Sequence, residues 1–260
     1  MSARVDFSRN ANVYDRRHGV VLPGDTARAL ASAAAFQPRA RVLDVGAGTG
    51  RVAIPFSEIG CDVWALDPAH GMLEVLRGKA SGLTLRLVAG EGARLPFEAS
   101  CFDAVVIARL LYLLPDWRDA LRDAVRVLKP EGRLLHEWAN GRPDEEWVQI
   151  REKARALFED AGVEQPFHPG VRSEVEVEAF LAELGLARSA DVRIGPGPGS
   201  TLADFLGRIV SGECSYIWNV PDAIQRQCLP ELRAWAEGRF DLGRSAPMPR
   251  ELSWKVYRSA

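Results

Sequence analysis

The feature that most constrains this chain is an apolar run that ends in three alternate glycines, VLDVGAGTGR at residues 42–51. Glycine adopts left-handed backbone conformations readily, so this pattern is typical of a strand that turns sharply into a helix. Such a turn lets a ligand approach the backbone and the N-terminus of the helix. The run therefore predicts either a ligand-binding turn or a tight turn that holds no ligand.

Short apolar runs alternate with helical segments between Arg41 and Trp138. The runs are RVLDV, CDVWALD, LTLRLVA, FDAVVIA and RLLHEW. Apolar runs separated by helices indicate strands of a mainly parallel sheet that is covered by helices on both faces. We therefore expect an α/β fold.

The rest of the chain adds helices around this unit. GDTARALASAAAF precedes it as a helix, GPGPGS at residues 195–200 interrupts regular structure, and two helical patterns follow before the strand-like ELSWKVYRS. We expect one domain over residues 1–260. Its parts are an N-terminal helical cap at 1–38, a core at 40–195 and 249–260, and a helical insertion, or lid, at 200–248 on the substrate side.

Composition excludes several classes of protein. The formal net charge of −2 comes from 33 basic and 35 acidic residues, which argues against a nucleic-acid partner. The N-terminus lacks the apolar core of a secretory signal, and the longest apolar stretch, at residues 104–114, is too short to span a bilayer. The cysteines are far apart, which predicts reduced thiols in a cytoplasmic protein without a metal site; they are Cys61, Cys101, Cys214 and Cys228.

The glycine turn does not match a dinucleotide site. A dinucleotide fingerprint has a glycine or alanine where this chain has Arg51. Asp44, two residues before Gly46, would repel a pyrophosphate, whereas it suits a ligand that carries a cation. The alternative for Asp44 is that it orders the loop by accepting local N–H groups.

A second carboxylate, Asp67, ends the second apolar run. At that position an acidic side chain can accept both hydroxyls of a ribose. Alternatively Asp67 caps the helix that follows, with Pro68 at its first position, and its two oxygens allow both roles. A ribose with an amino-acid tail and no phosphate fits this pair of carboxylates. The tail's carboxylate would meet backbone N–H groups at the helix N-terminus, which describes S-adenosylmethionine.

At this point the sequence resembles the class I S-adenosylmethionine-dependent methyltransferases, in the subgroup that acts on small molecules. The matching segments are VLDVGAGTG, ALDPAHGML, GEGARLPFEASCFDAVV and RVLKPEGRLL, in the family's order and over about residues 40–138. The resemblance implies a Rossmann-like sheet of seven strands whose last strand is antiparallel and enters between its neighbours. ELSWKVYR would be that strand.

The resemblance also implies a cofactor-binding set. The residues that would wrap the methionine part of S-adenosylmethionine are Gly46, Ala47, Gly48 and Gly50. Asp67 would hold the ribose, and Met72 would pack on the adenine.

Three further positions depart from the family pattern or allow two interpretations. The family's GDA is Gly90-Glu91-Gly92 here, so Glu91 either reaches the adenine or faces solvent, while a backbone contact at Gly92 is unaffected. Arg109 either pairs with the ligand carboxylate or bridges to an acidic residue in the loop. Tyr14 either folds over the cofactor or anchors a loose terminus.

The chemistry requires orientation of two molecules in a dry pocket, and no residue pattern identifies a general base. His136, at the end of the fifth run, is the best candidate, although a packing role suits it better; His18 is a weaker one. Several aromatic residues either line an acceptor cavity or form core: Trp138, Trp147, Phe205, Tyr216 and Trp218.

We therefore expect methyl transfer from S-adenosylmethionine to a small, apolar or aromatic acceptor by a monomer or homodimer that has no membrane or nucleic-acid partner. One alternative is a non-catalytic regulatory protein that binds S-adenosylmethionine. The other is an NAD-dependent oxidoreductase, against which Arg51 and Asp44 argue.

Overall fold

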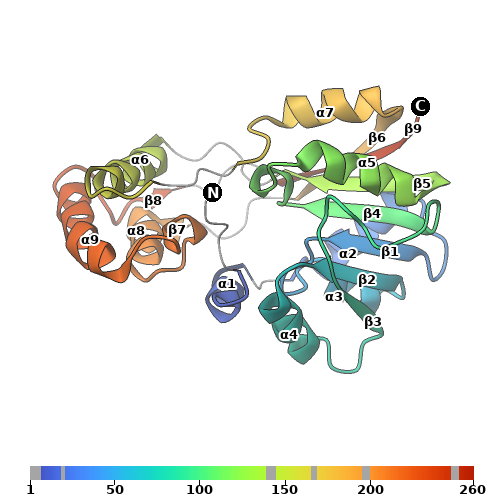
Figure 1. Ribbon diagram of the computed structural model, residues 1–260, viewed down its shortest axis with the longest axis horizontal. Helices are drawn as coiled ribbons and strands as arrows, with labels where there is room; N and C mark the ends of the chain where they lie inside the picture. Colours follow the sequence, from blue (N-terminus) through green and yellow to red (C-terminus); the bar gives the residue numbers. More distant parts are fainter. Residues whose placement is uncertain (1–6, 19–20, 139–144, 165–168, 195–199, 247–251) are drawn as a thin grey trace. The chain divides into compact units, whose positions relative to one another are not determined.

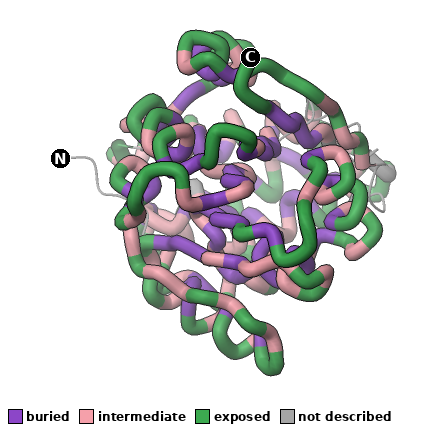
Figure 2. Tube along the Cα trace, turned by 90° about the vertical axis from the view of Figure 1, so that its right-hand side faces the viewer, coloured by how far each residue is buried: buried purple, intermediate pink, exposed green. Residues whose placement is uncertain are grey.

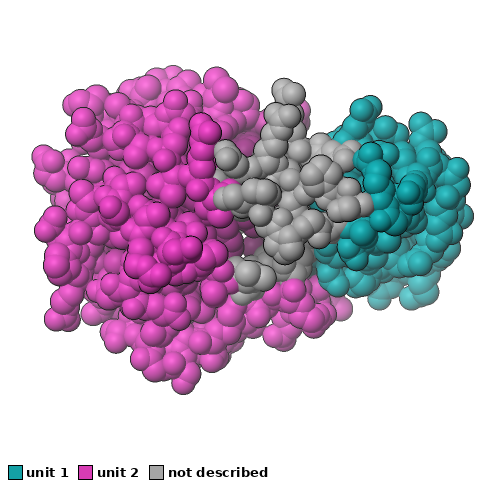
Figure 3. All heavy atoms as spheres, turned by 180° about the vertical axis from the view of Figure 1, so that it is seen from behind, with its two compact units in different colours: residues 1–6, 140–167, 195–252 teal, residues 7–139, 168–194, 253–260 magenta. Residues whose placement is uncertain are grey.

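The computed structural model describes residues 7–18, 21–138, 145–164, 169–194, 200–246 and 252–260. The chain forms two compact units (Figure 3). One, here called the core unit, contains residues 7–139, 168–194 and 253–260. The other, the helical unit, contains residues 1–6, 140–167 and 195–252.

A seven-stranded sheet forms the centre of the core unit (Figure 1). Its strands are β1 (Arg41–Val45), β2 (Asp62–Asp67), β3 (Leu85–Ala89), β4 (Phe102–Ala108), β5 (Leu128–Glu137), β6 (Leu186–Ile194) and β9 (Leu252–Ser259). The order is β3-β2-β1-β4-β5-β9-β6, and the pairs from β3 to β5 are parallel. β9 is antiparallel to β5 and lies between β5 and β6. The expected seven-stranded, Rossmann-like sheet is confirmed.

Helices cover both faces of the sheet because its strands are apolar on both sides. α5 (Trp117–Val127) and α7 (Glu174–Glu183) pack on the face that carries Leu134. α2 (Gly24–Ala33), α3 (Ala53–Glu58) and α4 (His70–Lys79) pack on the opposite face, which carries Leu135. Figure 2 shows buried positions through the interior of the molecule and exposed ones along the outer segments.

The N-terminal segment is held against α4. The Lys79 ammonium lies 2.7 Å from Asp15 of α1 (Ala11–His18). The Gly71 N–H donates to the Ser8 hydroxyl at 3.3 Å, and a Cβ at Gly71 would lie 2.2 Å from the Ser8 carbonyl oxygen. Gly71 therefore allows the close approach of the N-terminal segment.

The helical unit has its own apolar core. Its elements are α6 (Glu145–Asp160), α8 (Leu202–Val210), α9 (Asp222–Glu237), the 3₁₀ turns of Ser215–Ile217, and the short strands β7 (Ser200–Thr201) and β8 (Ser245–Ala246). α6 belongs here because its buried residues pack with those of α8 and α9. The unit thus includes residues 140–167, which the sequence boundaries assigned to the core at 40–195.

One sequence expectation differs locally from the structure, and a second falls largely outside the described residues. β5 begins at Leu128, before the expected run RLLHEW, with an irregular register opposite Phe102 and Ala104. The break expected at GPGPGS falls largely on residues 195–199, which lie outside the described residues. Among the helices that are described, none is long and apolar enough to cross a membrane.

The packing of Gly50, in the turn after β1, can be tested against Gly60, because both glycines have a φ of +92° and differ in their surroundings. A Cβ at Gly50 would lie 2.3 Å from Leu76 Cδ1, whereas a Cβ at Gly60 would meet no atom within 4 Å. We expect Gly60→Ala to cost about 1–2 kcal/mol of unfolding free energy for the backbone conformation alone. Gly50→Ala should cost about 1–3 kcal/mol more, since it also overpacks the core. Urea denaturation measures both, and equal losses would contradict this packing role of Gly50.

Candidate functional site

Charged residues lie at the carboxyl ends of four adjacent strands. In sheet order β2-β1-β4-β5, they are Asp67, Asp44, Arg109 and Glu137, with Arg51 from the turn after β1. Parallel strands end at the same edge of a sheet, which is where ligands bind in open α/β folds. We call these five residues the charged edge.

The glycine loop follows β1 directly at this edge. The N–H groups of Gly46 and Ala47 donate to the Leu66 carbonyl at 2.8 and 3.0 Å. The Gly50 N–H donates to the Ala47 carbonyl, and the Gly48 N–H donates to Asp67 Oδ2 at 2.9 Å. Four N–H groups of the loop thus already have acceptors inside the protein. The expected contact of a ligand carboxylate concerns the N–H groups at the helix N-terminus, and it stays a prediction.

Asp67 connects the loop to the next turn. Its Oδ2 accepts from Gly48, and its Oδ1 accepts from the Ala69 N–H at 2.8 Å. α4 begins at His70 with Ala69 as its N-cap, so Asp67 is not the cap and exposed Pro68 is not the first helical residue. Burial raises the pKa of Asp67, and the charge of Glu91 raises it further, against the two backbone donors. Each oxygen retains a lone pair that a ligand hydroxyl can use.

Asp44 is the most strongly perturbed carboxyl group of the edge. It is buried, and burial followed by the charge of Asp67 raises its pKa from 3.8 to about 7. The Ala53 N–H and the Arg51 charge oppose this shift. Asp44 Oδ2 and the buried Thr49 hydroxyl find no hydrogen-bond partner among the described residues. A positively charged ligand group near Asp44 would satisfy the carboxylate and favour its ionised form.

Arg51, Glu137 and Arg109 form a partly buried ion cluster beside Asp44. Arg51 Nη1 and Nη2 donate to Glu137 Oε2 and Oε1 at 2.6 and 2.9 Å. Arg109 Nη2 donates to Glu137 Oε1 at 3.4 Å, and its Nε lies 3.3 Å from Oε2. Arg109 thus bridges to an acidic residue, but to one that ends β5, whereas its second interpretation placed that partner in the loop. The Glu137 side chain is fully buried.

The remaining cofactor candidates lie around the loop. The Tyr14 Cε1 atom is 3.8 Å from the position that a Cβ on Gly48 would take. Gly92 is buried and a Cβ there would lie 3.1 Å from Val45 Cγ1, while Glu91 is exposed, as its solvent-facing interpretation proposed. Met72 is buried on α4.

His136 does not have the properties of a general base. It follows Leu134 by two residues, so it lies on the face covered by α5 and α7. Burial and the charge of Lys255 lower the pKa of His136 to about 3. The imidazole is therefore neutral at physiological pH and binds a proton too weakly to remove one effectively. The side chain of His18 lies outside the described residues.

The candidate acceptor-lining aromatic residues fall in different units. Trp138 belongs to the core unit, 6.4 Å from the Tyr112 ring and 6.2 Å from the His136 ring. Trp147 and Phe205 stack at 4.5 Å inside the helical unit. Trp218 there donates to the Gly212 carbonyl at 2.8 Å, and the Tyr216 side chain lies outside the described residues.

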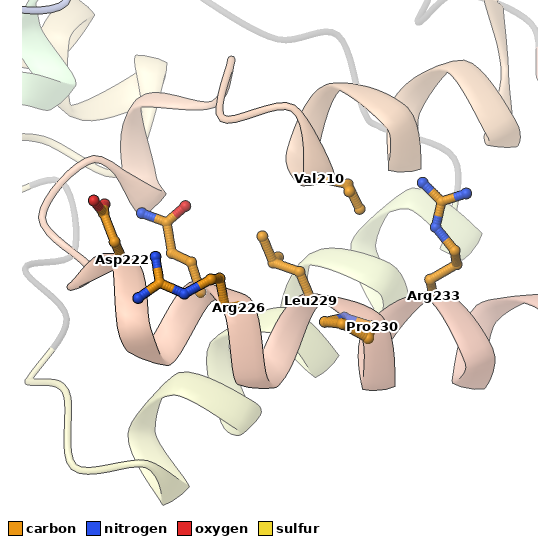
Figure 4. A pocket seen from close by; sticks show the side chains of 7 residues that line it. Val210, Asp222, Arg226, Leu229, Pro230 and Arg233 are labelled. Carbon is orange, nitrogen blue, oxygen red and sulfur yellow. The ribbon is translucent and has the colours of Figure 1, made fainter.

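A groove of about 500 Å³ lies within the helical unit between α8 and α9 (Figure 4). Val210, Leu229 and Pro230 form its apolar part, and Arg226 and Arg233 of α9 lie on either side of it (Figure 4). The groove shares no residue with the charged edge. Across the described residues, no three His, Cys, Asp or Glu side chains are placed to hold a metal ion.

Sequence reasoning missed the central position of Glu137. Its available signal is a charged residue that ends an apolar strand in RLLHEW, on the face opposite His136. Arg51 was noted only as a departure from the dinucleotide fingerprint, yet it is the partner that neutralises Glu137.

Comparisons with known proteins give the family and the fold that this chain resembles. Residues 43–136 match a family model described as "Methyltransferase domain". The chain is 39% identical over 132 residues to a "Demethylmenaquinone methyltransferase" of Renibacterium salmoninarum. The aligned region covers 50% of this chain and 55% of that protein. It is 35% identical over 153 residues to an "Uncharacterized methyltransferase" of Mycobacterium tuberculosis, and this alignment covers 56% of this chain and 61% of that protein. The chain thus spans little more than half the length of these relatives.

Solved structures share the fold at low sequence identity. The YcgJ protein of Bacillus subtilis has a TM-score of 0.61 at 20% identity, covering 92% of this chain and 100% of that one. A structure described as the [4+2]-cyclase SpnF has a TM-score of 0.62 at 13% identity, covering 97% and 93%. These similarities show the fold alone.

The raised pKa of Asp44 predicts a pH dependence of stability. The folded protein binds the Asp44 proton more tightly than the unfolded chain, so this group's contribution is full below about pH 4 and is lost as the pH rises to about 7. We expect Asp44→Asn to gain stability relative to the wild type as the pH rises from 5 to 8, by about 1.4 kcal/mol per unit at most.

Denaturant titrations at each pH measure this difference. Exposed Asp222 provides a matched control, and Asp222→Asn should show no such trend. A constant difference between Asp44→Asn and the wild type at all pH values would contradict the assigned environment of Asp44.

Proposed function

The chain belongs to the class I S-adenosylmethionine-dependent methyltransferases, and we propose that it transfers the cofactor's methyl group to a small-molecule acceptor by in-line attack. S-adenosylmethionine is the cofactor that this family membership implies. The family match covers the part of the chain that forms β1 to β5. The activity of the whole protein is inferred from that part and from the charged edge.

One observation carries the proposal: a buried carboxylate with an unpartnered oxygen lies beside a second carboxylate at the glycine loop. A diphosphate at this position would face two carboxylates, so the site disfavours NAD. A sulfonium or ammonium group would be attracted to the same carboxylates. The residues present therefore fit S-adenosylmethionine better than a dinucleotide.

Each cofactor candidate has a proposed task. Asp67 accepts the ribose hydroxyls with the lone pairs that Gly48 and Ala69 leave unused, and Asp44 attracts the positively charged end of the ligand. The glycine loop at Gly46, Ala47, Gly48 and Gly50 provides close approach, with Tyr14 near Gly48. Met72, Pro68, Glu91 and Gly92 are proposed to shape the adenine end.

When bound, S-adenosylmethionine supplies an electrophilic methyl group whose leaving group is a neutral thioether. The protein's contribution is then to orient the acceptor and to exclude water. The charged side chains at the edge of the sheet are the described groups that could orient the two molecules. His136, at the other face and with a pKa of about 3, is not assigned a proton-transfer role.

We propose an apolar or aromatic acceptor. The relatives that match over half of the chain include several named demethylmenaquinone methyltransferase, which supports this class without identifying the molecule. Tyr112, in the 3₁₀ turn of Leu111–Leu113 after β4, and Trp138, directly after β5, provide aromatic surface near the edge. The likeness to a [4+2]-cyclase shows that this fold can carry a different reaction, so the function has to be tested at the site.

Binding experiments test the cofactor directly. Equilibrium dialysis should show binding of S-adenosylmethionine and none of NAD. If NAD binds instead, the methyltransferase proposal is wrong. Binding of S-adenosylmethionine without conversion to S-adenosylhomocysteine, across a screen of phenolic and quinol acceptors, would favour the regulatory alternative.

Asp67→Asn tests the ribose contact. Hydrogen bonds to a charged group contribute about 1.5–3 kcal/mol, so we expect affinity for S-adenosylmethionine to fall about 10- to 100-fold. Asp62→Asn, at the opposite end of the same strand and paired with Arg41 and Arg86, is the matched control. Calorimetric titration measures both variants. An equal effect in the two would exclude a specific role for Asp67.

A further inference from the structure

Two guanidinium groups share one carboxylate at the charged edge. Arg51 and Arg109 both contact Glu137, so this part of the edge carries one positive charge in excess. The excess lies at the ends of β4 and β5. The two carboxylates Asp44 and Asp67 lie at the neighbouring strands β1 and β2. The edge thus has an acidic half and a basic half.

The excess charge resides on Arg109. Arg51 binds Glu137 with two hydrogen bonds of 2.6 and 2.9 Å. The corresponding approaches of Arg109 are 3.3 and 3.4 Å, and its buried Nε has no partner with hydrogen-bond geometry among the described residues. A guanidinium has five N–H donors, so Arg109 retains capacity for another anion. Its side chain is 26% exposed, which leaves it accessible to a ligand.

The backbone at Arg109 is held in an unusual conformation. Its φ is +54°, in the left-handed region that residues with a Cβ rarely adopt. The Arg109 N–H donates to the Glu137 carbonyl at 2.9 Å, which fixes the residue in this conformation. Strained backbone of this kind is often found where a side chain has a functional position.

Among the described residues of the charged edge, no group is placed to remove a proton from the acceptor. Glu137 is fully buried and bound by two arginines, and His136 lies on the opposite face with a pKa of about 3. Asp44 and Asp67 occupy the half assigned to the cofactor. An acceptor that must lose a proton before it attacks therefore has to arrive at this edge as an anion, or to be stabilised as one.

We propose that Arg109 binds the acceptor, and that the acceptor is a weakly acidic hydroxyl compound, a phenol, enol or hydroquinone, which reacts as its anion. This inference rests on the proposed function and names the substrate class for it. The proton of the acceptor passes to solvent when the anion forms beside Arg109. The anion's electron pair then forms the bond to the methyl carbon, and the pair of the breaking carbon–sulfur bond stays on sulfur.

The competing interpretation assigns Arg109 to the cofactor's own carboxylate. The two interpretations differ in which ligand, the acceptor or the cofactor, binds more weakly when the guanidinium is removed. They are separated by measuring cofactor and acceptor binding independently, without relying on turnover.

The experiment uses S-adenosylhomocysteine and 4-nitrophenol, a phenol whose anion absorbs visible light. Calorimetry measures S-adenosylhomocysteine binding to the wild type, Arg109→Gln and Arg109→Lys. Absorbance then measures the ionisation of 4-nitrophenol in the presence of each protein saturated with S-adenosylhomocysteine. Arg28→Gln on α2, an exposed arginine on the face opposite α5 and α7, is the matched control.

We expect the wild type and Arg28→Gln to bind 4-nitrophenolate and to shift its ionisation toward lower pH. Arg109→Gln should bind the anion at least about tenfold more weakly than the wild type and should not shift its ionisation. Arg109→Lys should retain part of the ionisation shift. All variants should bind S-adenosylhomocysteine with an affinity within about twofold of that of the wild type. A wild type that binds S-adenosylhomocysteine but not the nitrophenolate would overturn this inference alone. So would an Arg109→Gln variant that loses only S-adenosylhomocysteine. A wild type that binds neither S-adenosylmethionine nor S-adenosylhomocysteine would instead overturn the proposed function.

Discussion

The burial of Asp44 beside a second buried carboxyl group, Asp67, determines much of the chemistry at this edge. Both carboxyl groups are buried, and each is positioned by the backbone: Asp67 by the N–H groups of Gly48 and Ala69, and Asp44 by that of Ala53. Burial and the charge of Asp67 raise the pKa of Asp44 to about 7. A cationic ligand near Asp44 would favour its ionised form, so ligand binding and loss of the Asp44 proton are coupled.

The balance of charge changes across the sheet. The carboxylates end β1 and β2, while Arg109 follows β4 and Glu137 ends β5 with Arg51 bound to it. This gradient follows from the strand order, because residues far apart in sequence meet at one edge. It accounts for a cationic cofactor on one half and an anionic acceptor on the other within a single proposal.

The sheet and the glycine loop were predictable from local patterns, whereas the ion cluster was not. Apolar runs such as VLDV and DVWALD indicate strands, and ELSWKVYR indicates the antiparallel strand through its resemblance to the family. The pairing of Arg51 with Glu137 joins residues 86 positions apart, so no local pattern reveals it. The placement of α6 in the helical unit is also non-local, because its apolar face fits either unit until α8 and α9 are positioned. The pKa of His136 depends likewise on burial and on Lys255 from another strand.

A crystal structure of the protein with S-adenosylhomocysteine tests the central claim most directly. The account predicts the ribose hydroxyls within hydrogen-bond distance of Asp67, with the amino-acid tail toward Asp44. The ligand's thioether sulfur should face the half of the edge that holds Arg109. An empty loop at saturating ligand, or a dinucleotide diphosphate seated between Asp44 and Asp67, would contradict it.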